Sequence, residues 1–323
     1  MNESPLFWPA QLKGNVLYVL DETLIPSKIR YIPVRNTRQA VQVIRDMKTR
    51  AFGQFLVVLN TFLLEINRNK NKSSAEILKV IQSTAKGLNA SRPTFPFSDV
   101  TSIVVGWAQK ANAEGLNLSE YVTKNIQGYL QGIRYRRLER VRKIAEVIKN
   151  HDRILTHCNL SGELAMAAKI CQAQKKNIRF FATETRPYFQ GAKLTCWELQ
   201  QMGAKVTLIP DNAVGNLMAE RFVNKVIIGS DRSCANGDIA NKIGTYQIGV
   251  LAKEFGVPVY VLTQPSNTIK KGEDIPIEIR EADELLTFEG KRIFEGKVSG
   301  FYPGFDVLPN ELITEAIAIH AGA

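Results

Sequence analysis

The sequence is poor in the residue types that usually hold metal ions or cross-link a chain, with 3 histidines and 4 cysteines among its 323 residues. Neighbouring cysteines are at least 13 positions apart, and the four are Cys158, Cys171, Cys196 and Cys234. The sequence therefore has no Cys-x-x-Cys pair of the kind that structural zinc sites usually need. We predict no metal site and no cofactor.

Long hydrophobic runs are also missing. The longest apolar stretch, Phe55–Ile66, is interrupted by Asn60, Thr61 and Glu65, whereas a membrane-spanning helix takes about 20 apolar residues. The first residues do not combine a basic segment with an apolar one, as a secretory signal does. We expect a protein without membrane association in a reducing, cytoplasmic compartment.

Acidic residues are outnumbered, because 42 Lys and Arg against 31 Asp and Glu give a net charge of +11. Such an excess favours anionic partners, including phosphorylated metabolites. The most basic stretch, Arg134–Lys143, could be a nucleic-acid stripe. However, Glu139 interrupts it and apolar residues recur at helical spacing. We therefore interpret it as the solvated face of a long helix and predict no nucleic-acid binding.

The second half of the chain alternates strand-like and helix-like segments. Short runs rich in β-branched and aromatic residues are separated by stretches in which apolar residues recur at helical spacing. We predict strands at 153–158, 179–185, 205–210, 225–231 and 257–263, and helices at 163–176, 194–202, 214–222 and 243–255. This alternation indicates β-α-β units, in which helices cover a parallel sheet.

The first half is mostly helical. Two strand-like runs, 15–20 and 28–33, indicate a hairpin, and helical patterns follow at 37–48, 52–67, 74–88, 98–114 and 118–149. We predict an α/β protein with two domains: a mostly helical N-terminal domain at 1–148 with a small β-hairpin, and an α/β domain at 149–323. The limit between them falls within one long helical pattern.

Polar residues gather where the predicted strands end, and ligands bind beyond the carboxyl ends of strands in an open parallel sheet. Cys158 follows one strand and precedes a helix that should start near Gly162, where a helix N-terminus lowers the pKa of a thiol. A free cysteine is usually a small buried hydrophobe, but this position favours a reactive thiol. Because His157 points to the opposite face, we expect it to be packed or hydrogen-bonded rather than paired with that thiol.

Asp231 ends a strongly apolar run. It could simply cap a loop or helix, but partial desolvation would raise the pKa of its carboxyl and make it a proton donor near neutral pH. Lys242 lies in a segment, 235–245, that we expect to run from a loop into a helix. A cation there opposes the helix macrodipole unless a phosphate is bound, and the alternative is a solvated surface lysine. Arg50 and Arg92 flank helical patterns, and each alone is typical of a surface charge.

Taken together, these motifs resemble the methylthioribose-1-phosphate isomerase family of methionine salvage. Its superfamily includes ribose-1,5-bisphosphate isomerase and the regulatory subunits of the exchange factor for eukaryotic translation initiation factor two. The resemblance is carried, in order, by LDETLIP (20–26), SRPT (91–94), LTHCN (155–159), ETRPYFQGAKLTCWEL (184–199), IPDNAVGNLM (209–218), GSDRSCANGDIANKIGT (229–245), DIPIEIR (274–280) and PGFDVLPNELIT (303–314). It implies a helical N-terminal domain, a Rossmann-like C-terminal domain and a homodimer.

The resemblance also implies roles for particular residues. The cysteine of the family's T-H-C-N motif and the aspartate of its G-x-D-R motif form a catalytic pair, which falls here on Cys158 and Asp231. The family's contacts to substrate and phosphate fall on Arg50, Arg92, Gln190, Asn241 and Lys242. The implied partner is a phosphorylated pentose, and no metal is implied.

On this resemblance we predict an isomerase that converts an aldose 1-phosphate to a ketose 1-phosphate. The LDETLIP segment and Asn159 favour 5-methylthioribose 1-phosphate as its substrate. Two alternatives stay open. One is an isomerase of another sugar 1-phosphate, such as 5-deoxyribose 1-phosphate or ribose 1,5-bisphosphate. The other is a non-catalytic, sugar-phosphate-sensing regulatory subunit, although such subunits generally lack the catalytic pair.

One segment departs from the family pattern. The family's loop R-G-A-P-A-I-G reads here Arg50-Ala51-Phe52-Gly53-Gln54-Phe55. Glycine lets a backbone amide approach a ligand closely, so Ala51 and Phe52 should reshape the wall near the substrate. We expect this chain to accept a smaller or differently placed group at C5 than methylthioribose 1-phosphate carries, or to handle that substrate poorly.

Overall fold

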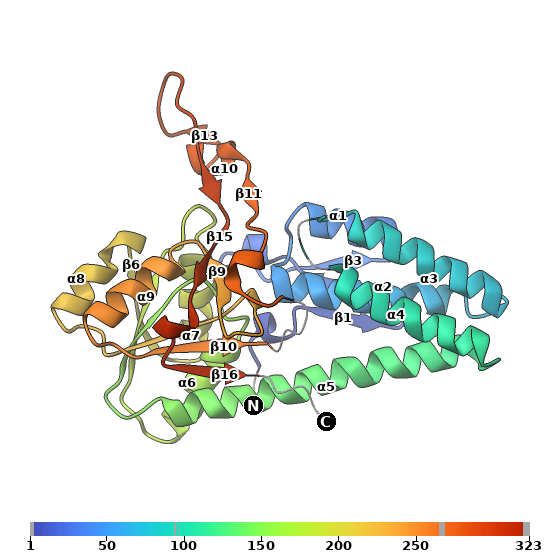
Figure 1. Ribbon diagram of the computed structural model, residues 1–323, viewed down its shortest axis with the longest axis horizontal. Coiled ribbons are helices and arrows are strands. Elements are labelled where there is room, and N and C mark those ends of the chain that lie inside the picture. The colour runs from blue at the N-terminus through green and yellow to red at the C-terminus, as the bar shows by residue number, and fades with distance from the viewer. Residues whose placement is uncertain (1–2, 94, 96, 265–268, 319–323) are drawn as a thin grey trace. The chain divides into compact units, whose positions relative to one another are not determined.

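The computed structural model describes residues 3–93, 95, 97–264 and 269–318. The chain divides into two compact units, Met1–Tyr135 and Arg136–Ala323. The division falls within the 30-residue helix α5 (Leu118–Val147), which is drawn in green in Figure 1. The limit predicted at residue 148 lies just past the end of the same helix.

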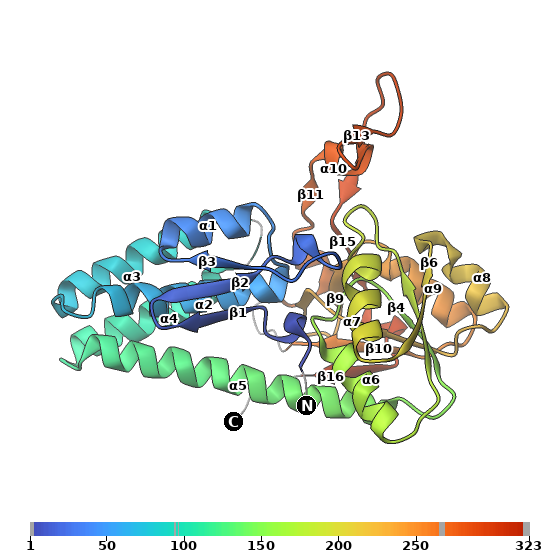
Figure 2. The same cartoon turned by 180° about the vertical axis from the view of Figure 1, so that it is seen from behind.

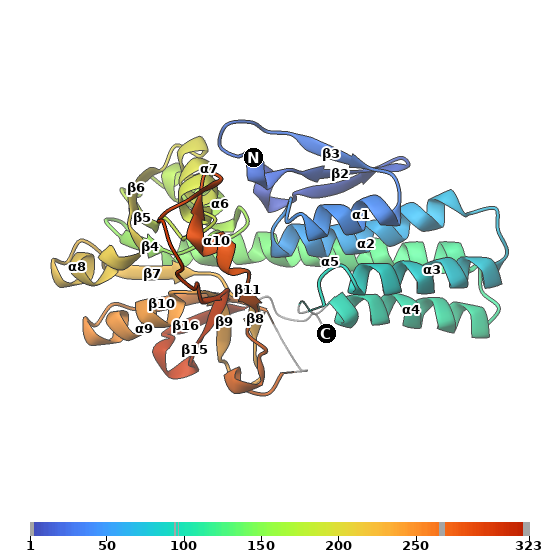
Figure 3. The same ribbon diagram turned by 90° about the horizontal axis from the view of Figure 1, so that it is seen from above.

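The first unit combines helices with a small antiparallel sheet of order β1-β2-β3. The expected hairpin is formed by β2 (Val16–Leu20) and β3 (Tyr31–Val34), whereas the sequence pattern does not predict β1 (Ala10–Lys13). The helices are α1 (Thr37–Arg45), α2 (Ala51–Arg68), α3 (Ser74–Asn89), α4 (Phe97–Ala113) and the first part of α5. Figure 3 shows the sheet lying along α1 and α2, and α2 contacts both β1 and β2.

Helix α2 is the centre of this unit and is buried on almost all sides, which explains its long apolar run. The two polar residues that interrupt the run bond within the helix. The Asn60 amide donates to the Leu56 carbonyl at 2.8 Å, and the Thr61 hydroxyl donates to the Val57 carbonyl at 2.6 Å. Both side chains are thereby satisfied inside an apolar core.

The second unit is built on a parallel sheet of six strands, in the order β16-β10-β7-β4-β5-β6. The strands are β4 (Arg153–Thr156), β5 (Arg179–Thr183), β6 (Lys205–Ile209), β7 (Lys225–Ile228), β10 (Val259–Thr263) and β16 (Glu315–Ala318). From β4 the chain continues through β5 to β6 on one side, and from β7 it continues through β10 to β16 on the other. The predicted α/β class and the Rossmann-like arrangement are confirmed.

Helices cover both faces of this sheet. Helix α6 (Glu163–Ala173) packs with α7 (Cys196–Gln201), and α8 (Val214–Ala219) packs with α9 (Thr245–Glu254). Figures 2 and 3 show the two pairs on opposite faces. The segment before α7, Gly191–Thr195, forms a π-helix that the sequence pattern does not predict.

The second unit also contains a smaller sheet and a projecting extension, which carry residues of the candidate site. A three-stranded sheet of order β15-β9-β8 is formed by Arg232–Ser233 (β8), Ile239–Lys242 (β9) and Phe305–Leu308 (β15). An extension then projects from the second unit in Figures 1 and 2. It comprises β11 (Ile279–Arg280), α10 (Ala282–Leu286), β12 (Thr287–Phe288), β13 (Lys291–Arg292) and β14 (Tyr302–Pro303).

The interpretation of Arg134–Lys143 as a solvated face is wrong for two of its arginines. Arg137 and Arg140 are 3% and 4% exposed, and both form ion pairs with Glu163, which is 1% exposed. The Arg140 guanidinium also donates to the Thr263 carbonyl at 2.8 Å. These arginines are buried because Glu163, in the first turn of α6, offers them a carboxylate that helical spacing alone does not reveal.

Candidate functional site

The candidate site lies at the carboxyl edge of the six-stranded sheet, where the strand order changes direction. The strands β4 and β7 are neighbours and pair in parallel, with Leu155 opposite Val226. Cys158 follows β4 and Asp231 follows β7. Ligands of open α/β sheets bind at this switch point, because the loops leave the two strands in opposite directions and open a crevice between them.

Cys158 is half-buried and has a left-handed backbone, with φ of 63°. Its N–H donates to the Thr185 hydroxyl at 3.0 Å, and its carbonyl accepts from the Thr195 hydroxyl at 2.6 Å. Helix α6 follows at Glu163, with Gly162 as its N-cap, as the sequence predicts. The start of a helix favours negative charge nearby, which suits a thiolate.

His157 is buried, and both of its ring nitrogens are hydrogen-bonded to groups other than the thiol, as the sequence predicts. Its Nδ1 lies 2.6 Å from the Thr183 hydroxyl and its Nε2 lies 2.9 Å from the Ile243 carbonyl. Burial lowers the pKa of His157 and favours the neutral ring. A side chain at Gly244 would meet this ring, since its Cβ would lie 3.3 Å from Cε1.

The backbone of Asp231 is bonded to the three-stranded sheet β15-β9-β8 and does not lie in a free loop. Its N–H donates to the Ala240 carbonyl at 2.9 Å, and the next residue, Arg232, pairs with Ala240 in the β8–β9 ladder. Strand β9 also carries Asn241 and Lys242. The structure therefore brings three of the predicted site residues together on two paired segments, although Asn241 and Lys242 follow Asp231 by ten and eleven positions in the sequence.

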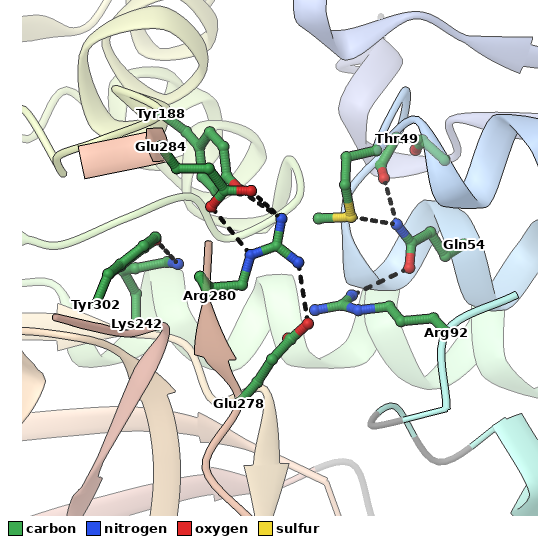
Figure 4. A network of polar contacts seen from close by, with 10 residues as sticks. Thr49, Gln54, Arg92, Tyr188, Lys242, Glu278, Arg280, Glu284 and Tyr302 are labelled. Carbon is green, nitrogen blue, oxygen red and sulfur yellow. Dashed lines mark hydrogen bonds and ion pairs between the residues drawn. The ribbon is translucent and has the colours of Figure 1, made fainter. Parts of the chain in front are cut away.

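The sequence pattern predicts Lys242 near the start of a helix, and this prediction is wrong. Lys242 is not a solvated surface lysine either. It belongs to β9, is 6% exposed, and donates to the Tyr302 hydroxyl at 3.1 Å (Figure 4). Its ammonium also lies 5.0 to 5.7 Å from the ring centres of Phe305, Tyr302 and Tyr188. Aromatic faces attract a cation. The electrostatic environment of Lys242 is therefore set by three aromatic rings and not by the dipole of a helix.

Asn241 points to the other side of β9. Its amide donates to the Thr245 hydroxyl at 3.0 Å, next to the start of α9. The residue paired with it on β15 is Asp306, whose carboxylate accepts from the Gly244 N–H at 2.8 Å and caps that helix. Burial raises the pKa of Asp306 to about 6, against the opposing effect of the backbone N–H groups at the helix start.

Gln190 lies directly before the π-helix and is 5% exposed. Its side-chain oxygen is buried without a hydrogen-bond partner. Buried polar atoms are nearly always paired, so this atom is suited to a ligand. The π-helix itself depends on Gly191, because a Cβ there would lie 1.7 Å from the Thr183 carbonyl oxygen.

A polar cluster that the sequence pattern does not predict lies beside Lys242. The Arg280 guanidinium donates to the Tyr188 hydroxyl at 2.7 Å, forms a double contact with Glu284 and pairs with Glu278 at 3.0 Å (Figure 4). Burial raises the pKa of Tyr188 to about 12. Arg280 stands at the end of DIPIEIR, a motif whose charged residues were the available signal. Its carboxylate partners are two and four positions away, but Tyr188 comes from a distant segment.

Arg50 and Arg92 lie in the first unit, where one polar network connects their surroundings. The Gln54 amide donates to the Thr49 carbonyl at 3.0 Å, and its oxygen accepts from Arg92 at 3.1 Å (Figure 4). Glu22, of the LDETLIP segment, accepts from the Thr49 hydroxyl and from the Arg50 N–H. Arg92 is only 9% exposed, so neither arginine is an isolated surface charge.

Phe52 has a place in the core of the first unit. Its ring packs edge-on against Trp8, with 5.7 Å between centroids, and stacks on Phe55 at 6.2 Å. The extra volume of this side chain is therefore taken up by an aromatic row. The neighbouring Gly53 is required because a Cβ there would lie 1.7 Å from the Thr49 hydroxyl.

Within the described ranges, no group of three or more His, Cys, Asp and Glu side chains is arranged to hold a metal ion. No helix among the same residues is long and apolar enough to cross a membrane.

Comparisons with known proteins place these features in a family. The model of the Initiation factor 2 subunit family matches residues 54–319. A protein of Desulforudis audaxviator named methylthioribose-1-phosphate isomerase is 37% identical, over 97% of this chain and 92% of its own length. A protein of the same name from Thermosipho africanus is 36% identical, over 94% and 91%.

Solved structures of two kinds share the fold. The 5-methylthioribose 1-phosphate isomerase of Pyrococcus horikoshii OT3 is 28% identical with a TM-score of 0.84, over 99% of this chain and 94% of that chain. The structure described as subunit delta of translation initiation factor eIF-2B from A. fulgidus is 29% identical with a TM-score of 0.81, over 97% and 94%.

Proposed function

This chain belongs to the Initiation factor 2 subunit family, and we propose that it is an isomerase that converts 5-methylthioribose 1-phosphate to 5-methylthioribulose 1-phosphate. The observation that carries the proposal is the placement of Cys158 and Asp231 after neighbouring strands at the switch point of the sheet. The relatives that bear the isomerase name match nearly the whole chain. A thiol and a carboxyl at one crevice supply the base and the acid that the reaction needs.

The first chemical difficulty is ring opening. The phosphate on the anomeric oxygen prevents the sugar ring from opening spontaneously to an aldehyde. In our proposal the Asp231 carboxyl protonates the ring oxygen while the bond between that oxygen and C1 breaks. The ring oxygen becomes a hydroxyl, and the phosphate ester oxygen stabilises the positive charge at C1. Asp231 is left as a carboxylate.

The second step moves hydrogen from C2 to C1. The Cys158 thiolate removes the C2 proton, and the electrons of that bond form the C1–C2 double bond of an enediol phosphate. Asp231 then takes the proton of the C2 hydroxyl, C2 becomes a carbonyl, and C1 receives the proton held by Cys158. Both residues return to their starting states. A direct hydride shift would instead retain deuterium placed at C2, whereas transfer through Cys158 exchanges part of it with solvent.

Five residues are proposed to hold the substrate, namely Arg50, Arg92, Gln190, Asn241 and Lys242. The two arginines and the lysine would bind the phosphate through charge-assisted hydrogen bonds. The unpaired side-chain oxygen of Gln190 would accept a hydrogen bond from a sugar hydroxyl. We further propose that the protein acts as a cytoplasmic homodimer, for which light scattering should give twice the 36.1 kDa mass of the chain.

The test is phosphorus NMR of the purified protein with a panel of sugar 1-phosphates. The panel contains 5-methylthioribose 1-phosphate, 5-deoxyribose 1-phosphate and ribose 1,5-bisphosphate. We expect rapid conversion of the first, and faster turnover of another member would reassign the substrate. The likeness to the A. fulgidus subunit keeps a sugar-phosphate sensor as a second candidate, which tight binding of one member without turnover of any would support.

A further inference from the structure

Threonine hydroxyls hold both backbone polar groups of Cys158. Thr185 accepts its N–H at 3.0 Å, and Thr195 donates to its carbonyl at 2.6 Å. The two threonines are 0% and 1% exposed, so water does not compete for these contacts. A left-handed backbone at a residue other than glycine is strained and persists only where its surroundings enforce it. At Cys158 the two hydroxyls supply that enforcement.

A chain of hydrogen bonds that begins at His157 orients the Thr185 hydroxyl. The Ile243 carbonyl can only accept, so Nε2 of the ring carries the hydrogen. The ring is favoured in its neutral form, so Nδ1 accepts from the Thr183 hydroxyl. The Thr183 oxygen can then accept from the Thr185 hydroxyl at 3.3 Å. Thr185 is left with a lone pair for the Cys158 N–H.

The contact with Thr195 is fixed in the same way. Its oxygen accepts from the Asn159 amide at 3.0 Å, and the same amide donates to the Glu198 carboxylate at 2.7 Å. The Thr195 hydroxyl hydrogen therefore points to the Cys158 carbonyl. Thr195 is the last residue of the π-helix, a wide turn that is frequent at functional sites.

We propose that Thr185 and Thr195 are positioning residues that aim the Cys158 thiol at the reacting carbon. The proposal rests on the proposed function, in which Cys158 moves the proton. Because the hydroxyls bind the backbone and not the thiol, they set where the sulfur lies without entering the reaction. Their loss should slow the chemical step and leave substrate affinity unchanged.

The experiment compares Thr195→Val with Thr195→Ser. Valine keeps the shape of threonine and removes the hydroxyl, whereas serine keeps the hydroxyl. We expect Thr195→Val to lower kcat by about 10- to 100-fold with an unchanged KM, the size of effect that a small misplacement of a catalytic group produces. Thr195→Ser should recover most of that loss. Thr207→Val, at an exposed threonine of β6, is the matched control and should behave as wild type.

The inference is overturned if Thr195→Val keeps full kcat, if its loss lies in KM, or if serine is as damaging as valine. A second measurement needs no substrate: the rate at which iodoacetamide labels Cys158, followed by mass spectrometry. Labelling should accelerate in Thr195→Val, because the half-buried thiol is no longer held, and not in Thr195→Ser. If wild type converts no sugar 1-phosphate, the proposed function fails, and an unchanged labelling rate in Thr195→Val would separately reject the positioning role.

Discussion

At the scale of single residues, Asp231 is the proposed acid and its carboxyl can be replaced by an amide of nearly the same shape. We expect Asp231→Asn to fold normally, since the backbone contact with Ala240 does not involve the side chain. Turnover should fall by about 100- to 10,000-fold, the usual contribution of a general acid. Steady-state kinetics together with a thermal unfolding curve make the test. A variant that retains wild-type turnover would remove Asp231 from the mechanism.

Cys158 should be the thiol that controls activity. Burial raises the pKa of Cys196 to about 11 and also raises the pKa values of Cys171 and Cys234, so these three thiols remain protonated near neutral pH. We expect iodoacetamide to inactivate the protein by labelling Cys158, with protection by substrate. Cys158→Ser should lose most activity and still bind substrate. Full inactivation with label on Cys234 alone would show that the wrong thiol had been chosen.

At the scale of elements, the start of α2 is where this chain departs from its family. The sequence predicts a reshaped substrate wall, whereas the structure places Phe52 in an aromatic row with Trp8 and Phe55. We therefore expect Ala51→Gly with Phe52→Ala to destabilise the protein by about 1–3 kcal/mol through lost packing. The ratio of catalytic efficiencies for the methylthio and deoxy substrates should stay the same.

Chemical denaturation gives the stability of that variant, and the single change Ala51→Gly is its control. If the double variant shifts the ratio of catalytic efficiencies about 10-fold or more, Ala51 and Phe52 do shape the wall near the substrate, and the packing role of Phe52 is secondary.

The junction of α5 with α6 should be a large contributor to stability. Glu163→Gln removes the carboxylate that both buried arginines share, and breaking a buried ion pair typically costs about 3–5 kcal/mol. Glu139→Gln is the matched control, because Glu139 pairs with Arg142 at the exposed surface and such pairs contribute about 0–1 kcal/mol. Urea unfolding of the two variants should separate them clearly. Equal losses would mean that the buried cluster adds nothing beyond a surface pair.

At the scale of the whole molecule, the dependence of stability on pH should report the buried His157. Burial lowers its pKa in the folded state, so between that lowered value and the ordinary value near 6.5 the unfolded chain binds more protons. The contribution of His157 to the free energy of unfolding is therefore fully present above the ordinary pKa. It is lost as the pH falls from that value through the lowered pKa of the folded state.

Acidification from neutral pH should cost wild type more stability than it costs His157→Gln, measured as the free energy of unfolding at each pH. His151→Gln, at an exposed histidine, is the control and should follow wild type. Asp306 acts in the opposite sense, since its pKa is raised to about 6, but it is present in all three proteins and cancels in the comparison. Parallel curves for wild type and His157→Gln would contradict the prediction.

The sequence by itself determined the alternation of strands and helices, the α/β class and the positions of Cys158 and Asp231 at strand ends. These features follow from local patterns: side chains alternate along a strand, and polar residues mark where an apolar strand stops. The family motifs added Gln190, Asn241 and the arginines, whose roles stay proposals.

Tertiary structure alone decided the surroundings of those residues. Lys242 lies on a strand among aromatic rings, and Arg137 lies in a buried ion pair, because their partners come from segments far away in the sequence. The same holds for Thr195, which reaches Cys158 from 37 positions away through a π-helix. A local pattern predicts which residues can be buried or paired, but the choice of partner is made only when distant segments pack together.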